Sequence, residues 1–132
     1  MSKPFSLMFF SAVNGFAAVL MGALGAHALK VQLTDRGALA AWQTASNYHL
    51  AHAIASFAAL AWAAAQPERG VALGRVATCW LAGALLFSGS IYALSLGGPR
   101  WLGPVTPMGG LAFLLGWSLL AVEALRRPAS RA

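Results

Sequence analysis

Charged side chains are scarce in this sequence of 132 residues. They make up 9% of the chain, whereas hydrophobic residues make up 59%. A soluble domain typically carries about 25% charged residues, which it needs to cover its surface. The shortage of charge therefore argues against a soluble domain and indicates an integral membrane protein whose partner is the lipid bilayer.

Residues that support metal or nucleophilic chemistry are also few. Cys79 is the single cysteine, so the chain can form no internal disulfide and no thiolate metal cluster. Asp35 is the one aspartate and lies in a connection between apolar runs, so no Ser-His-Asp set can be assembled. No glycine-rich phosphate loop follows a strand pattern. We therefore expect no enzyme, no cofactor and no resident metal.

The net charge of +6 could in principle indicate an acidic partner. The basic residues, however, are spread over the termini and short connections, and they form no stripe with interleaved aromatics that would bind nucleic acid. Basic residues also orient membrane proteins, because they remain on the cytoplasmic side. With four spans, six basic residues lie on the side of the two termini and three on the other side: Lys3, Arg69, Arg75, Arg126, Arg127 and Arg131 against Lys30, Arg36 and Arg100. This bias predicts that both termini are cytoplasmic.

Four apolar runs are long enough to cross a membrane, which takes ~20 residues for roughly 30 Å of hydrocarbon. They cover about residues 5–29, 40–65, 71–96 and 108–125. They predict an all-α, integral membrane four-helix bundle that forms a single domain over residues 1–132. The first run resembles a signal peptide, but it is longer than the about 7–15 apolar residues of such a segment and contains Asn14. We expect it to remain in the protein as a helix.

Local signals suggest where two of the helices begin. Thr34 or Asp35 could cap a helix that runs from about residue 36 to 65, by accepting hydrogen bonds from its first N–H groups. Thr106 followed by Pro107 has the pattern of an N-cap and a first helical residue.

Other residues within the runs indicate packing contacts. A ridge of small side chains that recur every four residues would let another helix approach the first one closely: Asn14, Ala18, Gly22 and Ala26. Glu123 is the only acid within a span and lies beside Arg126 and Arg127, so we expect a salt bridge or an interfacial position there.

Polar residues recur at helical spacing inside the second and third runs. Thr44, Tyr48, His52 and Ser56 form one row at i, i+4 spacing, with His49 at its edge. Because an unpaired polar group in hydrocarbon is costly, we expect such side chains to face the interior of the bundle and to bond one another. The candidate polar cluster comprises Asn14, His27, Gln43, Thr44, Asn47, Tyr48, His49, His52, Ser88, Ser90 and Tyr92.

Three interpretations of this cluster remain open. In the first, the side chains are interhelical hydrogen-bonding groups in a structural or interaction protein. In the second, Tyr48 and His52 serve a small transporter or proton-conducting protein, since intramembrane ionisable residues often mark such pathways. In the third, His27, His49 and His52 hold a metal or haem, although no carboxylate lies near them in sequence.

Several blocks, in this order, resemble the YgdD-like family of small four-helix inner-membrane proteins. They are GALGAHAL at 22–29, WQTA at 42–45 with Tyr48 and His52, FSGSIY at 87–92, VTPMGG at 105–110 and FLLGW at 113–117. Together they extend over nearly the whole chain, and His49 is the one addition to the pattern.

The resemblance implies a multi-pass protein of the bacterial inner membrane with no assigned activity. It also implies that a shared site would draw on the signature positions His27, Trp42, Tyr48, His52, Ser88, Ser90, Tyr92, Thr106 and Pro107. The glycines of these blocks would serve close helix approach: Gly22, Gly25, Gly89, Gly109 and Gly110. A structural, interaction or accessory role, with a membrane-protein partner or a second copy of the chain, is the function expected.

Overall fold

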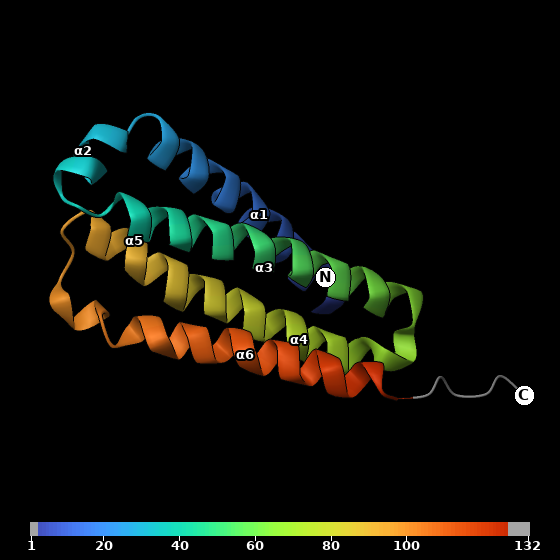
Figure 1. The fold of residues 1–132 in the computed structure, drawn as a ribbon. Coiled ribbons are helices and arrows are strands. Elements are labelled where there is room, and N and C mark those ends of the chain that lie inside the picture. Colours follow the sequence, from blue (N-terminus) through green and yellow to red (C-terminus); the bar gives the residue numbers. More distant parts are fainter. Residues whose placement is uncertain (1–2, 127–132) are drawn as a thin grey trace, which may run out of the picture.

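Helices make up most of the part of the chain that the computed structural model describes, residues 3–126, and no strand occurs among these residues. Four segments are long and apolar enough to cross a membrane: Ser6–Ala26, Leu39–Ala65, Pro67–Ser95 and Arg100–Ala124. The predicted all-α architecture with four spans is confirmed (Figure 1). In chain order the elements are α1 (Lys3–Ala26), α2 (Lys30–Asp35), α3 (Leu39–Ala65), η1 (Pro67–Arg69), α4 (Gly70–Gly83), η2 (Ala84–Ser88), α5 (Gly89–Ser95), η3 (Arg100–Leu102) and α6 (Val105–Ala124).

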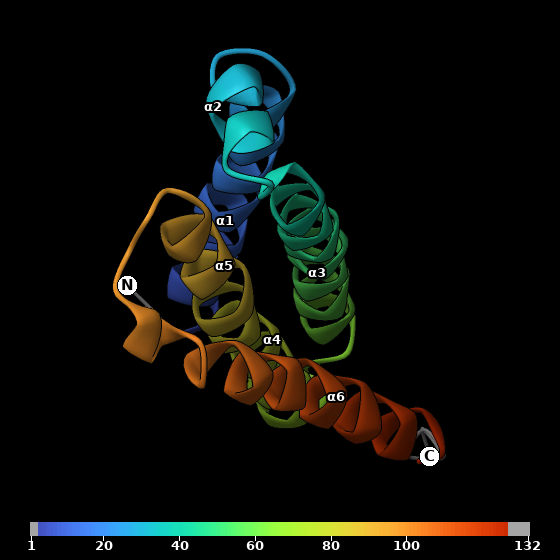
Figure 2. The ribbon, with the colours of Figure 1, turned by 60° about the vertical axis from the view of Figure 1, so that its left-hand side comes forward.

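The four spans do not all contact one another equally. α3 packs against α1 and α4, α6 packs against α4 and η2, and α1 makes a smaller contact with α4. α1 and α6 lie on opposite sides of the molecule in Figure 1, and in Figure 2 α1 lies behind α5 while α6 runs along the lower side. The span built from α4, η2 and α5 is therefore the central one, which contacts each of the other three spans.

Two tryptophans indicate how α3 sits in a bilayer. Trp42 and Trp62 are 20 residues apart, which corresponds to about 30 Å along a helix and equals the usual thickness of the hydrocarbon layer. Tryptophan is enriched at both membrane–water interfaces. With the two indoles at the two interfaces, His52, which lies midway between them, would be at the centre of the hydrocarbon layer.

The predicted start of α3 is wrong. Thr34 and Asp35 belong to the short helix α2, and α3 begins at Leu39 with Ala38 as its N-cap and no side-chain cap. Thr34 lies inside α2, four residues before the N-cap of α3, and its hydroxyl donates to the carbonyl of Lys30 at 2.8 Å within the same short helix. Gly37, with a φ of +65°, makes the turn between the two helices, a conformation that glycine adopts without strain.

The predicted start of α6 is also wrong, by a short distance. α6 begins at Val105, and its N-cap is Pro104 without a side-chain hydrogen bond. Thr106 lies inside the first turn, and its hydroxyl is 2.7 Å from that of Ser90 on α5. Thr106 therefore joins two helices and does not cap one.

The central span contains a π-helical turn, η2, that the sequence pattern does not reveal. It lies where α6 crosses the span. A side-chain carbon on Gly109 of α6 would overlap the backbone of Phe87, and one on Gly83 would overlap the ring of Phe113. These two glycines allow the backbone of α6 to lie directly against η2.

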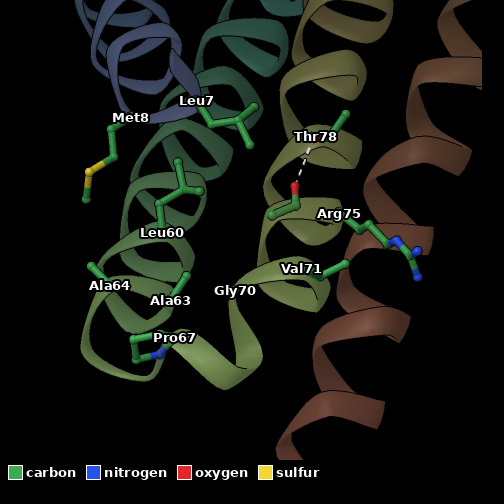
Figure 3. Close-up of a pocket in the computed structure, with 11 residues that line it drawn as sticks. Leu7, Met8, Leu60, Ala63, Ala64, Pro67, Gly70, Val71, Arg75 and Thr78 are labelled. Carbon is green, nitrogen blue, oxygen red and sulfur yellow. Dashed lines mark hydrogen bonds between the residues drawn. The ribbon is translucent and has the colours of Figure 1, made fainter. Parts of the chain in front are cut away.

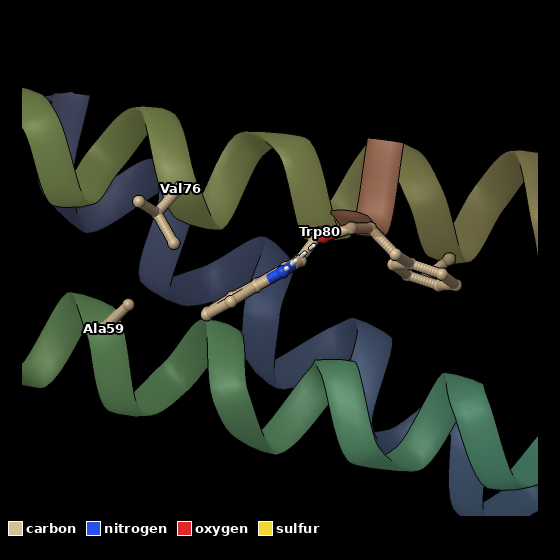
Figure 4. Packing of buried hydrophobic residues seen from close by; sticks show 5 residues of the cluster. Ala59, Val76 and Trp80 are labelled. Atoms are coloured by element: carbon tan, nitrogen blue, oxygen red, sulfur yellow. Dashed lines mark hydrogen bonds between the residues drawn. The ribbon is translucent and has the colours of Figure 1, made fainter. Parts of the chain in front are cut away.

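Two hydrophobic clusters fill the interior. One comprises Ala59, Val76, Trp80, Ala84 and Phe113 and joins α3, α4, η2 and α6 (Figure 4). The other comprises Leu33, Trp42, Ala45 and Tyr92 and joins α2, α3 and α5. Each holds a buried indole whose N–H is satisfied: Trp80 donates to the carbonyl of Phe113 at 3.3 Å, and Trp42 donates to that of Met21 at 2.8 Å.

Glycines make room for both indoles. A side-chain carbon on Gly25 would overlap Trp42, and one on Gly116 would overlap Trp80. The predicted ridge on α1 is thus only partly correct. Ala18 is buried, but a side-chain carbon on Gly22 would have no neighbour within 4 Å, and Ala26 is exposed. The face of α1 that contacts α3 includes Gly25, which the four-residue spacing left out.

Candidate functional site

His49 is the centre of a hydrogen-bonded chain across three helices. Its Nε2 lies 3.0 Å from Oδ1 of Asn14 on α1, and its Nδ1 lies 3.3 Å from the hydroxyl of Tyr92 on α5. His49 and Tyr92 are each 7% exposed. With an amide oxygen as one partner, Nε2 must donate, and Nδ1 then accepts from the Tyr92 hydroxyl. The neutral ring therefore uses both of its nitrogens.

His52 forms a second and separate set of contacts. Its Nδ1 donates to the carbonyl of Tyr48 at 2.8 Å, and its Nε2 accepts from Nε1–H of Trp117 on α6 at 3.0 Å. The ring of Phe113 stacks on the imidazole with 3.6 Å between centroids and 16° between planes. Here too a neutral imidazole has its one donor and its one acceptor engaged.

Tyr48 borders a lateral groove between α3 and α6. Its side chain is 48% exposed and lies against Phe87 and Phe113, with ring centroids 5.1 and 6.2 Å away. The groove has a volume of about 580 Å³. Tyr48, His52 and Trp117 contribute the polar side-chain atoms of its lining. Aromatic and aliphatic side chains form the rest of its wall.

Two serines of the predicted cluster bond across helices. Ser88 donates to the carbonyl of Ala45 on α3 at 2.9 Å, and Ser90 is 2.7 Å from Thr106 on α6. Both serines are buried. These hydroxyls hold the central span to α3 on one side and to α6 on the other.

Four members of the predicted cluster lie elsewhere. His27 is exposed in the connection between α1 and α2, and Gln43, Thr44 and Asn47 are exposed on α3. The Thr44 hydroxyl donates to the carbonyl of Ala40 within its own helix at 3.0 Å. The prediction that all eleven residues face the interior is wrong for these four and for Tyr48, which is 48% exposed beside the groove. On α3 the buried face is occupied by Ala45, His49 and Ala53.

The histidines form no metal site in the structure. His27 is exposed outside the helices while His49 and His52 are buried within the bundle, and residues 3–126 contain no group of three His, Cys, Asp or Glu side chains placed to hold a metal ion. The interpretation in which these three histidines bind a metal or haem is therefore not supported over that range.

Sequence reasoning missed two important partners. Trp117, which bonds His52, lies within the FLLGW block but was not among the candidate residues. Arg69 was counted only among the basic residues on the side of the two termini, yet it is 7% exposed and its Nη1 is 2.9 Å from Oε1 of Glu123. The expected pairing of Glu123 with Arg126 is confirmed at 3.2 Å, while Arg127 lies outside the described residues.

Arg69 connects the turn at η1 with the end of α6. Its guanidinium donates to the carbonyls of Glu123 and Arg126, at 2.8 Å each, and to Oε1 of Gln66 at 2.6 Å. It also lies over the ring of Trp62, 5.4 Å from the centroid. A lone arginine in a turn gives no sequence signal for such a contact, because two of its partners are backbone carbonyls and the end of α6 lies more than 50 residues away in sequence.

The fold and these contacts define a small, multi-pass α-helical membrane protein whose spans are joined by buried hydrogen bonds. Comparison with known proteins identifies the family. A family described as "Protein of unknown function (DUF423)" matches residues 21–110. The chain belongs to this family.

Its relatives are membrane proteins by name. The UPF0382 membrane protein YwdK of Bacillus subtilis is 39% identical over 118 residues, which cover 87% of this chain and 92% of that protein. The UPF0382 inner membrane protein YgdD of Escherichia coli K12 is 39% identical over 123 residues, 91% of this chain and 89% of the relative. A UPF0382 membrane protein of Staphylococcus epidermidis is 32% identical over 115 residues, which cover 87% of this chain and 91% of that protein.

These relatives confirm the resemblance to the YgdD-like proteins and the assignment to the membrane. The family is one of unknown function. No solved structure matches the chain.

Proposed function

We propose that this chain is a non-enzymatic structural or interaction protein of the bacterial inner membrane, an accessory of a larger membrane assembly. The observation that carries the proposal is the closed hydrogen bonding of His49 and His52. Both nitrogens of each ring are bonded to groups of the protein, and these groups come from α1, α3, α5 and α6. Interhelical bonds of this kind stabilise a packed bundle.

The buried hydroxyls support a role without catalysis. A serine nucleophile needs a hydroxyl bonded to a general base. Ser56 donates to the carbonyl of His52 at 2.7 Å, and Ser88 donates to that of Ala45 at 2.9 Å. Glu123, whose carboxylate is buried, is held between two arginines. These groups act in packing.

The outer face of α3 supports association with a second copy of the chain. Gln43 and Asn47 are exposed, lie one turn apart, and bond to no other side chain within residues 3–126. Counted from Trp42, Asn47 lies about 7 Å inside the hydrocarbon layer, where an unpaired amide is costly. An amide group carries both donors and an acceptor, so two identical faces related by a two-fold axis complement each other.

Cysteine crosslinking in native membranes tests this association. In a Cys79→Ser background, Asn47→Cys should form a disulfide-linked dimer on mild oxidation. Leu111→Cys is the matched control and should stay monomeric: it is exposed on α6 and, like Asn47, lies about one turn from the level of His52 toward the α2 end. Equal crosslinking at the two positions, or none at Asn47→Cys, would contradict a dimer through α3.

One observation favours a second candidate function, a small transporter or proton-conducting protein. The groove between α3 and α6 reaches Tyr48 and His52 near the centre of the membrane. Purified protein in liposomes would show whether it conducts protons or other ions. A flux that His52→Gln abolishes and Ser118→Ala leaves unchanged would favour this function over the structural one. The apolar wall of the groove leads us to expect no flux above that of empty liposomes.

We also propose that both termini lie in the cytoplasm. Four antiparallel spans bring the η1 turn and the end of α6 to one end of the molecule, where Arg69 and Arg126 meet. Arg75 lies in the second turn of α4, near the same end. Lys30, Arg36 and Arg100 lie at the other end, and the larger number of basic residues on the first side supports a cytoplasmic location.

A further inference from the structure

A second groove, separate from the one beside His52, opens between the start of α1, the end of α3 and the start of α4 (Figure 3). Its volume is about 660 Å³. Leu7 and Met8 form one wall, and Leu60, Ala63 and Ala64 line the side given by α3. Almost the whole lining is therefore aliphatic.

Two glycines leave open space on the α4 side of this groove. Gly70 has no atom within 4 Å of where a side-chain carbon would stand, and Gly74 has only Cδ1 of Leu7, at 3.7 Å. Thr78, at the inner end, donates its hydroxyl to the carbonyl of Gly74 at 2.8 Å and so offers no donor to a ligand. The shape suits a flexible hydrocarbon chain.

The groove runs from the membrane surface inward. Pro67 and Gly70 lie in and after the turn that joins two spans, and Thr78 is eight residues further along α4. This distance is about 12 Å at the rise of an α-helix. One end of the groove is thus at the level of lipid headgroups, and the other is within the hydrocarbon layer.

One positive charge lies at the rim. Arg75 is exposed and lines the groove with its stem, while its guanidinium extends on the side of α6 (Figure 3). No ion pair within residues 3–126 includes Arg75, in contrast to Arg69 at the same end of the molecule, which is paired with Glu123. An arginine one or two turns inside a span can extend its head to the interface, and a guanidinium binds phosphate oxygens with two parallel hydrogen bonds.

We propose that this groove binds an anionic glycerophospholipid, with one acyl chain along Leu7, Leu60 and Gly74 and the phosphate at Arg75. Apolar walls, open space on the α4 side and a position that starts at the headgroup level fit the acyl chain of this ligand. Arg75 is exposed, and its guanidinium, which extends on the side of α6 in Figure 3, would turn toward the groove to meet the phosphate. Basic pockets between spans on the cytoplasmic side are a known way of holding anionic headgroups. The site is independent of the proposed α3 dimer, because it uses the other end of α3.

The test measures lipid retained by the intact protein. Purified protein in detergent would be incubated with phosphatidylglycerol or phosphatidylcholine of the same acyl chains, and bound lipid would be counted by native mass spectrometry. We expect the protein to prefer phosphatidylglycerol. Arg75→Gln should weaken its binding about tenfold, the effect of losing one hydrogen bond to a charged group, and should leave phosphatidylcholine unchanged. Arg100→Gln, which removes an exposed charge at the opposite end, is the matched control and should bind as the parent does.

Two further variants test the groove itself. Gly74→Leu and Ala64→Phe each fill part of the groove. Neither variant should bind phosphatidylglycerol or phosphatidylcholine, and both should keep the helical circular dichroism and the unfolding temperature of the parent. Two variants on different helices are used so that misfolding of one does not decide the result. The proposal is overturned if both folded variants retain lipid, if Arg75→Gln keeps the preference for phosphatidylglycerol, or if glycerol phosphate alone competes as well as the lipid.

Discussion

At the scale of single residues, His49 and His52 show how neighbours decide the role of a polar side chain in a membrane. The two rings are three residues apart on α3, and their hydrogen-bond partners assign them opposite tautomers. The oxygen of Asn14 assigns the proton of His49 to Nε2, and the carbonyl of Tyr48 assigns that of His52 to Nδ1. Each tautomer follows from the partner that can only accept.

The contact between Trp117 and His52 gives a direct prediction. Trp117→Phe keeps an aromatic ring on α6 but removes the N–H that donates to Nε2 of His52. We expect a loss of about 1 kcal/mol in the free energy of unfolding, as for other interhelical hydrogen bonds in membranes. Unfolding of the detergent-solubilised protein in SDS measures it. Trp101→Phe, at an exposed position in η3, is the control and should change nothing; an equal effect of the two would contradict the role of this bond.

Loss of the buried guanidinium of Arg69 should lower the free energy of unfolding by more than loss of the Trp117 hydrogen bond does. Arg69→Met removes hydrogen bonds to Gln66, Glu123 and Arg126 and leaves the Glu123 carboxylate with one partner. Breaking a buried ion pair on one side costs about 3 kcal/mol or more. We expect Arg69→Met to destabilise by this amount in the same unfolding assay.

The matched control for this prediction is Arg100→Met, an exposed arginine whose loss should have little effect. The double variant Arg69→Met with Glu123→Gln should cost less than the sum of the two single variants, because it leaves no charge behind. An additive result would mean that the two residues do not act as a pair.

The sequence predicted some of these residue roles and missed others for a physical reason. Polar groups in an apolar run must be satisfied, so interior bonding for His52, Ser88 and Tyr92 followed from composition and spacing. Which face of α3 is buried depends on where α1 and α4 pack, and spacing alone does not contain this information. Gln43, Thr44 and Asn47 were therefore placed inside although they are exposed.

At the scale of elements, the crossing of α6 over the π-helical turn is the tightest contact between spans. It depends on Gly109, where any side-chain carbon would overlap the backbone of Phe87. We expect Gly109→Ala to push α6 away and to cost about 2 kcal/mol, as overpacking usually does. The unfolding assay, together with loss of the near-ultraviolet signal of Trp80 and Trp117, would measure this change.

The neighbouring glycine supplies the control for that experiment. A side-chain carbon on Gly110 would meet only Cδ2 of Phe87, at 3.9 Å, which is an ordinary contact. Gly110→Ala makes the same chemical change in the same helix and should be neutral or slightly stabilising, because alanine favours the helix. A larger effect at 110 than at 109 would contradict the packing described for α6.

Spans were predictable from the sequence, but their irregularities were not. Long apolar runs separated by proline, glycine and charge locate α1, α3, α4 to α5 and α6 to within a few residues. The helix α2 lies in a polar stretch that has no spanning signal, and it packs through the single buried side chain of Leu33. The turn η2 depends on the approach of α6, which is a contact between distant parts of the chain.

At the scale of the whole molecule, the spans form an open arrangement with grooves on two sides. One groove, between α3 and α6, lies beside Tyr48 and His52, and the other lies at the η1 end between α1, α3 and α4. The polar groups inside join the helices, while the grooves and the outer face of α3 are available to other molecules. This division is why we assign an interaction role to the surface and a structural role to the interior.

The orientation of the molecule is testable with single cysteines. In a Cys79→Ser background, Asp35→Cys lies in α2 and Glu68→Cys in η1, both at exposed positions at opposite ends. With both termini in the cytoplasm, a membrane-impermeant maleimide should label Asp35→Cys on intact spheroplasts and Glu68→Cys only after lysis. The reverse pattern would place the termini outside.

The measurement that tests the central claim most directly is nitrogen NMR of the histidine rings in the folded protein. A closed packing network predicts Nε2–H for His49 and Nδ1–H for His52, each as a single tautomer whose ring proton exchanges slowly with water at neutral pH. His27, which is exposed, serves as the internal control and should exchange fast. If His52 instead interconverts between tautomers and exchanges with water as fast as His27, its surroundings are hydrated, and the structural account of the interior is contradicted.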